Sequence, residues 1–352
     1  MRMKIGLIGL PSSGKTACFT ALTGLEAHAS GAGEHIGVVS VPEPRLDRLA
    51  QLCSSKKVVY PEITFLDTPP LADDAPAEDI GKQLTRVAQE ADALALVLGC
   101  FGELNHKGEE LDPRSDLETV LLELTLADLS ATERRLERLK SESRKERSTY
   151  EEHLLQRMCE HLSGGALVSR MALTPEEEKL LRGYNLITIH PLLLVCNVGD
   201  DDLDGRKAEP ACALAEELAL PHLVLCAPLE TELAQLPENE REEFLRGFGL
   251  EQPARDRLIK LAYDVLRLIT FLTGREKEAR AWAIPRNTRA PQAAGKVHTD
   301  MEHGFIRAEV VALADLDRYG SMAECRKHGL VKLEGKDYVV QDGDVLDIRF
   351  SR

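Results

Sequence analysis

The fold is decided by residues 4–16, KIGLIGLPSSGKT. The apolar run at 4–9 predicts a buried strand and residues 15–23 predict a helix, so the motif G-x-x-x-x-G-K-[ST] lies where a phosphate loop requires it. The glycines let backbone N–H groups turn toward phosphate oxygens, and the helix N-terminus adds partial positive charge. We therefore expect phosphates to bind at Gly9, Pro11, Ser12, Ser13, Gly14, Lys15 and Thr16.

The same loop predicts a magnesium site. Lys15 is expected to reach the β- and γ-phosphates, and the Thr16 hydroxyl is expected to ligate Mg²⁺. Asp67 ends a second apolar run, ITFLD at 63–67. A carboxylate at the end of a strand in this kind of fold faces the metal, so Asp67 is the expected second anchor.

Further apolar runs alternate with helical segments along the chain. They lie at 93–99, 187–197 and 222–228. Such alternation is typical of an α/β fold with a parallel sheet covered on both faces.

Two regions differ from this pattern. In residues 111–185, leucines recur at three-, four- and seven-residue steps from Leu122 to Leu139, which predicts two long helices packed as an antiparallel hairpin. A break follows at residues 163–165, and Thr174-Pro175 predicts a new helix start. Residues 275–352 contain short elements separated by glycines and indicate a small α+β module, with a turn at residues 342–344.

Composition limits the function. The chain has 352 residues and a net charge of −15, so any contact with RNA must come from a local patch. Residues 275–352 sum to +1. No apolar run is long enough to cross a membrane, and the apolar stretch at the N-terminus is too short for the core of a signal peptide. The eight cysteines form no CxxC pair, so we expect reduced thiols and a cytoplasmic protein.

The chain resembles the YchF/Obg-like ATPase family, a group of translation-factor-class P-loop GTPases. The resemblance covers nearly the whole chain. It rests on KIGLIGLPSSGKT and GVVSVPEPRLDRL at the front, on DPRSDLETVLLELTLADL in the middle, and on FLTGREKEARAWAIPRNTRAPQAAGKVHTDMEHGFIRAEVV and LEGKDYVVQDGDVLDIRF at the back.

The resemblance implies three parts. A P-loop NTPase G domain would span 1–110 and 186–274, with an antiparallel helical coiled coil inserted at 111–185. A C-terminal TGS domain, an α+β module with a ubiquitin-like β-grasp fold, would span 275–352. The family is described as binding the ribosome and, in several members, as preferring ATP to GTP. For this chain we expect a monomer that binds a purine nucleotide with Mg²⁺ and contacts ribosome or RNA through the TGS and helical parts.

The family's base-reading motif, N-x-x-E, corresponds here to residues 197–200. Asn197 is kept, Val198 stands where other GTPases have a stacking Lys, and Asp200 replaces the Glu. Cys226 and Ala227 match the family's second base-contacting loop. Because Asp200 would accept from guanine N1–H and N2–H₂, whereas adenine offers only its N6 amino group, the choice between ATP and GTP stays open.

The hydrolytic half of the site departs from the family and from related GTPases. Ser12 replaces an Asn, no Thr aligns in the first switch at 30–36, and the second switch reads Asp67-Thr68-Pro69-Pro70. Proline has no N–H to offer the γ-phosphate, and Leu71 occupies the place of a catalytic Gln. Each missing transition-state contact costs about 10²–10⁵ in rate, so we expect slow intrinsic hydrolysis or none. No residue is assigned as catalytic.

Three readings follow. The first is a ribosome-associated switch with slow NTP hydrolysis. The second is a competent ATPase or GTPase in which a partner or an unrecognised residue completes the site. The third is a non-hydrolysing pseudo-GTPase scaffold that binds ribosome or RNA. Retained Lys15, Thr16 and Asp67 favour the first over the third.

Overall fold

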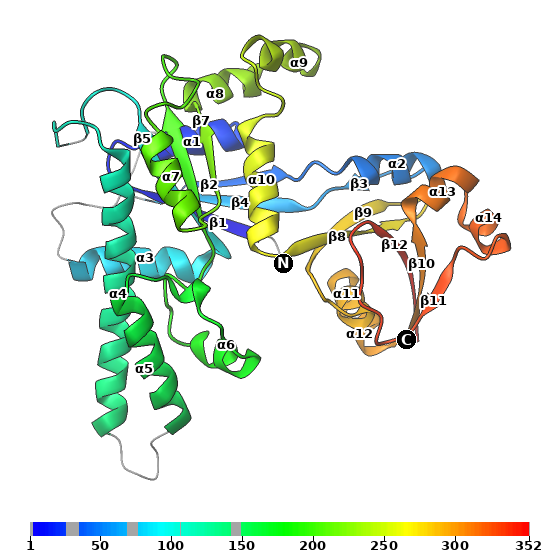
Figure 1. Cartoon of the computed structure of the whole chain (residues 1–352). Coiled ribbons are helices and arrows are strands. Elements are labelled where there is room, and N and C mark those ends of the chain that lie inside the picture. Colours follow the sequence, from blue (N-terminus) through cyan, green and yellow to red (C-terminus); the bar gives the residue numbers. More distant parts are fainter. Residues whose placement is uncertain (1–2, 26–34, 69–76, 106, 142–148, 352) are drawn as a thin grey trace. The chain divides into compact units, whose positions relative to one another are not determined.

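We describe a computed structural model, which covers residues 3–25, 35–68, 77–105, 107–141 and 149–351 (Figure 1). The chain forms two compact units. The larger unit contains residues 3–38 and 64–262, and the smaller unit contains residues 39–63 and 263 onward.

The larger unit is built on a six-stranded sheet. Its strand order is β2 (His35–Ser40), β4 (Glu62–Asp67), β1 (Met3–Gly9), β5 (Ala93–Cys100), β6 (Leu192–Val198) and β7 (His222–Leu225). Strands β1, β5, β6 and β7 pair in parallel. Almost every residue of β5 and β6 is buried, as expected for strands covered on both faces. The predicted α/β sheet is confirmed.

Helices connect these strands and cover the sheet. They are α1 (Lys15–Thr23), α3 (Ala77–Glu90), α4 (Pro113–Ser141), α5 (Thr149–Ser163), α6 (Pro175–Leu181), α7 (Glu209–Glu217), α8 (Ala227–Gln235), α9 (Glu238–Gly247) and α10 (Ala254–Val265), with a 3₁₀ turn at Val168–Arg170. A capping box at Thr174 begins α6 where the sequence predicts a start. In the described part of the chain, no helix is long and apolar enough to span a membrane.

The predicted helical hairpin consists of α4 and α5, which lie side by side (Figure 1). The first half of α4 packs on the sheet through Leu117, Val120 and Leu124. Its far end instead joins a separate apolar cluster with α5, through Leu139 and Met158. The hairpin is therefore rooted in the sheet by one helix.

Two predicted strands have different bounds. Strand β6 begins at Leu192 rather than at residue 187, because the backbone amides of Ile187 and Thr188 donate to the buried Asp128 of α4 and not to a strand. Strand β7 ends at Leu225 rather than at residue 228, because Ala227 already begins α8.

The smaller unit contains a second sheet. Its order is β11 (Lys332–Glu334), β10 (Phe305–Ala312), β12 (Asp344–Phe350), β8 (Leu268–Gly274), β9 (Ala279–Pro285) and β3 (Val58–Val59). Neighbours pair antiparallel, except that β12 runs parallel to β8 and β3 parallel to β9. Residues 336–340 form no strand of this sheet, and Val339 makes only an isolated bridge to Arg289.

Five helices complete the smaller unit: α2 (Pro44–Leu52), α11 (Ala290–Val297), α12 (Thr299–His303), α13 (Leu313–Tyr319) and α14 (Met322–Lys327). Adjacent strand residues face opposite sides of a sheet. Phe271 accordingly packs with α11, and Leu272 packs with α2 and α14.

The segment 39–63 lies in this smaller unit, whereas the expected boundaries put it in the first part of the G domain. Leu46 and Leu49 of α2 are fully buried in the cluster that covers β8 and β12. Ion pairs from Arg45 to Asp342 and from Arg48 to Asp317 join the segment to residues 297 and 269 positions later. The chain thus leaves the larger unit within β2 and returns within β4.

Candidate nucleotide-binding site

The phosphate loop has the expected backbone. It follows β1 directly, and α1 begins at Lys15. Gly14 adopts a left-handed conformation with φ 78°, and a Cβ there would collide with the side-chain amide of Asn197. Ser12 also has positive φ, 58°. Such a turn points successive N–H groups to one side, which is the arrangement that binds anions.

Asn197 lies at the carboxyl end of β6 and holds the loop in place. Its Nδ2 donates to the Ser13 carbonyl (3.2 Å), and its Oδ1 accepts from the Ala227 N–H (3.1 Å). The side chain is 3% exposed. Both ends of the amide therefore bind protein groups, so Asn197 ties the phosphate loop to the start of α8.

The other candidates for base recognition divide into two groups. Val198 is buried in the sheet's apolar core, so its side chain is not available to stack on a base. Asp200 is exposed, and its carboxylate lies near the buried Cys226. Burial raises the pKa of the Cys226 thiol, and Asp200 raises it further. The structure thus brings Asp200, Cys226 and Ala227 to one end of the sheet and leaves Val198 in the core.

Asp67 is the centre of a buried polar cluster beside the phosphate loop. The carboxylate is 3% exposed at the end of β4. Lys15 donates to its Oδ1 and to the Thr68 carbonyl, and the Thr16 hydroxyl donates to its Oδ2 (3.0 Å). Sequence reasoning predicted that these residues share a site, and the structure brings all three together.

His35 and Thr68 complete this cluster, and neither was singled out from the sequence. His35 Nδ1 lies 3.2 Å from Asp67 Oδ2, and the Thr68 hydroxyl donates to the Leu7 carbonyl (2.7 Å). His35 carries no local signal, because its partner is 32 residues away in the chain. Thr68 was detectable only as the neighbour of Asp67.

The residues present fit a divalent cation. Thr16 and Asp67 supply a hydroxyl and a carboxylate oxygen, which are the ligands that Mg²⁺ prefers. Among the described residues, no group of three or more His, Cys, Asp or Glu side chains could hold a metal. Thr16 and Asp67 would fill two positions of a coordination shell, and nucleotide phosphates would supply further oxygens.

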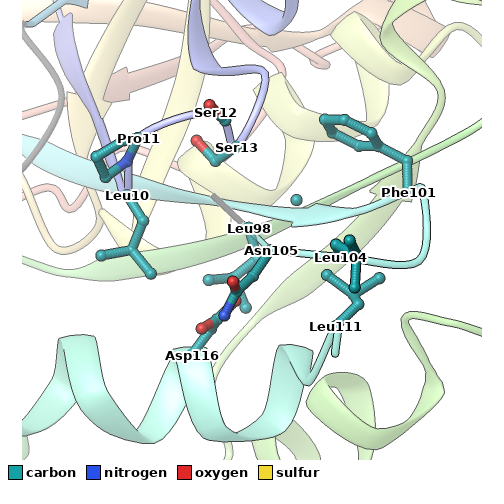
Figure 2. A pocket seen from close by; sticks show the side chains of 11 residues that line it. Leu10, Pro11, Ser12, Ser13, Leu98, Phe101, Leu104, Asn105, Leu111 and Asp116 are labelled. Carbon is teal, nitrogen blue, oxygen red and sulfur yellow. The ribbon is translucent and has the colours of Figure 1, made fainter. Parts of the chain in front are cut away.

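A cavity of about 190 Å³ flanks the phosphate loop (Figure 2). Its walls are mainly apolar and come from the loop, the end of β5, the segment between β5 and α4, and the first turn of α4. They include Leu10 of the loop and Phe101 and Leu111 of the connecting segment. Ser13 also lines it, and the buried Ser13 hydroxyl has no hydrogen-bond partner among the described residues. A small polar group in this cavity would satisfy that hydroxyl.

Most of the residues predicted to impair hydrolysis fall outside the described part of the chain. They are Pro69, Pro70 and Leu71, and residues 30–34 of the first switch.

Comparison with known proteins gives consistent matches. A family model, YchF-GTPase_C, described as a protein of unknown function (DUF933), matches residues 268–351. The chain is 35% identical to the ribosome-binding ATPase YchF of Haemophilus ducreyi and 34% identical to that of Bacillus subtilis, each over 100% of both chains. The structure of the Schizosaccharomyces pombe YchF GTPase matches with a TM-score of 0.84 at 25% identity, over 99% of this chain and 98% of that one.

Proposed function

The chain belongs to the YchF family, and from this premise we propose that it is a purine nucleotide-binding protein that associates with the ribosome and hydrolyses its nucleotide slowly. The observation that carries the proposal is the preformed phosphate loop, with Gly14 left-handed and Lys15 and Thr16 directed at Asp67. The relatives named ribosome-binding ATPases support the ribosome as partner.

The residues have separate tasks in this proposal. Backbone N–H groups of residues 12–16 bind the β-phosphate, and Lys15 exchanges its bonds to Asp67 and Thr68 for phosphate oxygens. Thr16 and Asp67 hold the Mg²⁺ ion, which neutralises charge on the phosphates. Asn197 holds the phosphate loop at the start of α8, and Asp200 is the group that hydrogen-bonds to the edge of the base.

Isothermal titration calorimetry tests nucleotide binding. Nucleotide-free protein is titrated with Mg²⁺ and a non-hydrolysable analogue of ATP, and then of GTP. We expect Lys15→Ala to weaken binding about 100-fold, which corresponds to about 2.7 kcal/mol. Lys140→Ala, at an exposed position on α4, is the matched control and should bind as the unmodified protein does.

The base preference follows from the same titrations. If the ATP analogue binds at least about tenfold tighter, Asp200 acts as the family's Glu does. If the GTP analogue binds at least about tenfold tighter, the Asp200 carboxylate recognises guanine. Equal heats for Lys15→Ala and the unmodified protein would contradict the proposed phosphate site.

The proposal also covers the cellular location, the oligomeric state and the surfaces that contact the ribosome. We propose a cytoplasmic monomer that contacts ribosomal RNA or protein through the smaller unit and the α4–α5 hairpin. Cosedimentation with ribosomes in the ATP-, GTP- and ADP-bound states tests this contact, and turnover measured with and without ribosomes separates slow hydrolysis from hydrolysis completed by the partner. Ribosome binding without any turnover would favour the scaffold reading.

A further inference from the structure

His35 belongs to the cluster around Asp67, but its side chain has no role in the proposed function. The two oxygens of Asp67 have different partners. Lys15 bonds to Oδ1, whereas Thr16 Oγ1 and His35 Nδ1 lie 3.0 Å and 3.2 Å from Oδ2. Two atoms, one from α1 and one from β2, therefore meet at Oδ2 of Asp67 on β4.

The spacing of these atoms matches an octahedral ion. Ligands at 2.0–2.2 Å from a metal lie about 3.0 Å apart when they occupy adjacent octahedral positions. The distances from Oδ2 to the Thr16 and His35 donors both have this value within 0.2 Å. An ion can therefore replace the hydrogen bonds among these groups while Lys15 leaves Asp67 for the phosphates.

The position of His35 is set by packing. The imidazole contacts the ring of buried Phe19 on α1, at a centroid distance of 6.0 Å. Gly37 lets β2 lie close to this helix, because a Cβ there would overlap Thr23 and press on Phe19. The His35 side chain is 31% exposed, and this packing holds the imidazole beside Asp67.

We propose that His35 Nδ1 is a direct ligand of the divalent ion in the nucleotide complex, beside Thr16 and Asp67, and that it makes the site favour Mn²⁺ over Mg²⁺. This inference rests on the proposed nucleotide site. Neutral imidazole is a common ligand of first-row transition ions, whereas Mg²⁺ prefers oxygen donors. The histidine compensates for the missing switch Thr with a nitrogen donor.

Pulsed electron paramagnetic resonance tests the bond directly. The protein is loaded with Mn²⁺ and a non-hydrolysable ATP or GTP analogue, whichever binds tighter, with its histidines labelled with ¹⁵N. We expect a ¹⁵N coupling to the Mn²⁺ spin, and we expect His35→Asn to abolish it. Asn places an amide oxygen near the Nδ1 position, so the fold and an oxygen ligand are kept. His153→Asn, at an exposed position on α5, is the matched control and should keep the coupling.

Nucleotide affinity with each ion gives a second readout. The ratio of affinities with Mn²⁺ and Mg²⁺ should fall about tenfold in His35→Asn relative to the unmodified protein. Comparing ratios removes the intrinsic difference between the two metal–nucleotide complexes.

The outcomes separate the two proposals. Tight nucleotide binding without a ¹⁵N coupling, and with an unchanged ratio in His35→Asn, would overturn the inference and leave the proposed function intact. His35 would then only position Asp67. Failure of the unmodified protein to bind nucleotide with either ion would overturn both.

Discussion

The two units use their polar side chains in different ways. In the larger unit, a few buried groups each hold several partners from distant segments, as Asp67, Asp128 and Asn197 do. In the smaller unit, Glu309 is a buried carboxylate with two partners, but most ion pairs lie on exposed strand and helix surfaces, as between Arg48 and Asp317 or Arg275 and Asp347. Single substitutions should therefore be costly in the larger unit and mild in the smaller one.

A convenient probe distinguishes the units. Trp282 is the only Trp in the chain and lies on β9 of the smaller unit. Its fluorescence follows unfolding of that unit, whereas far-ultraviolet circular dichroism follows helices in both. Urea unfolding curves recorded with both signals give the free energy of unfolding of each variant.

The largest effect is expected for Asp128→Ala. The buried carboxylate accepts from the amides of Ile187 and Thr188 and from the Thr188 hydroxyl, at 2.7–2.9 Å. Its removal leaves three donors without an acceptor and should lower the free energy of unfolding of the larger unit by about 3–5 kcal/mol. The dichroism transition should shift while the Trp282 transition stays in place.

The control for this prediction is Glu137→Ala, which removes an exposed acid from the same helix. A loss below about 1 kcal/mol for Asp128→Ala would show that the buried cluster is less important than its hydrogen bonds suggest.

Asn197→Ala should have the next largest effect. The substitution strips the Ser13 carbonyl and the Ala227 N–H of their partner, which should lower the free energy of unfolding of the nucleotide-free protein by about 2 kcal/mol. Nucleotide affinity should fall as well, since the loop is no longer held. If stability is unchanged and only affinity falls, Asn197 acts through the base and not as a tie between loop and helix.

Arg45→Ala tests the smaller unit. Arg45 bonds to Glu43 and to Asp342, which also accepts from the Thr270 amide. Because the pair with Asp342 is exposed, the loss should be only about 0.5–1 kcal/mol, seen in Trp282 fluorescence. A loss above about 2 kcal/mol would contradict the proposed contrast between the units, since an exposed pair would then contribute as much as a buried group.

The smallest effect is expected from pH. Hydrogen bonding to Arg326, with Arg349 also close, lowers the pKa of Glu309. A carboxyl group with a lowered folded-state pKa stabilises the fold above its unfolded pKa, and this stabilisation is lost as the pH falls through the folded value. The Trp282 transition should therefore move to lower urea concentration below about pH 4.3.

The variant Glu309→Gln supplies the comparison for this effect. It should be less stable than the unmodified chain at pH 7, and the difference should shrink as the solution is acidified. A constant difference across this range would assign the effect to packing and not to charge.

Much of the larger unit was predictable because its signals are local. The phosphate loop, the buried strands around Ile8 and Leu96, and the capping box at Thr174 each depend on a short window of sequence. Strand ends were less predictable: β6 starts late because Asp128, some 60 residues earlier, takes the amides of residues 187 and 188.

The amino-acid sequence by itself determined the phosphate loop, the alternation of strand and helix, the helical hairpin and the small C-terminal module, because periodicity and turn residues act over a few positions. Tertiary structure alone decided that 39–63 packs with the C-terminal strands, that both ends of the Asn197 amide bind protein, and that His35 meets Asp67. These contacts join residues tens to hundreds of positions apart, and their hydrogen bonds and burial leave no trace in the local pattern.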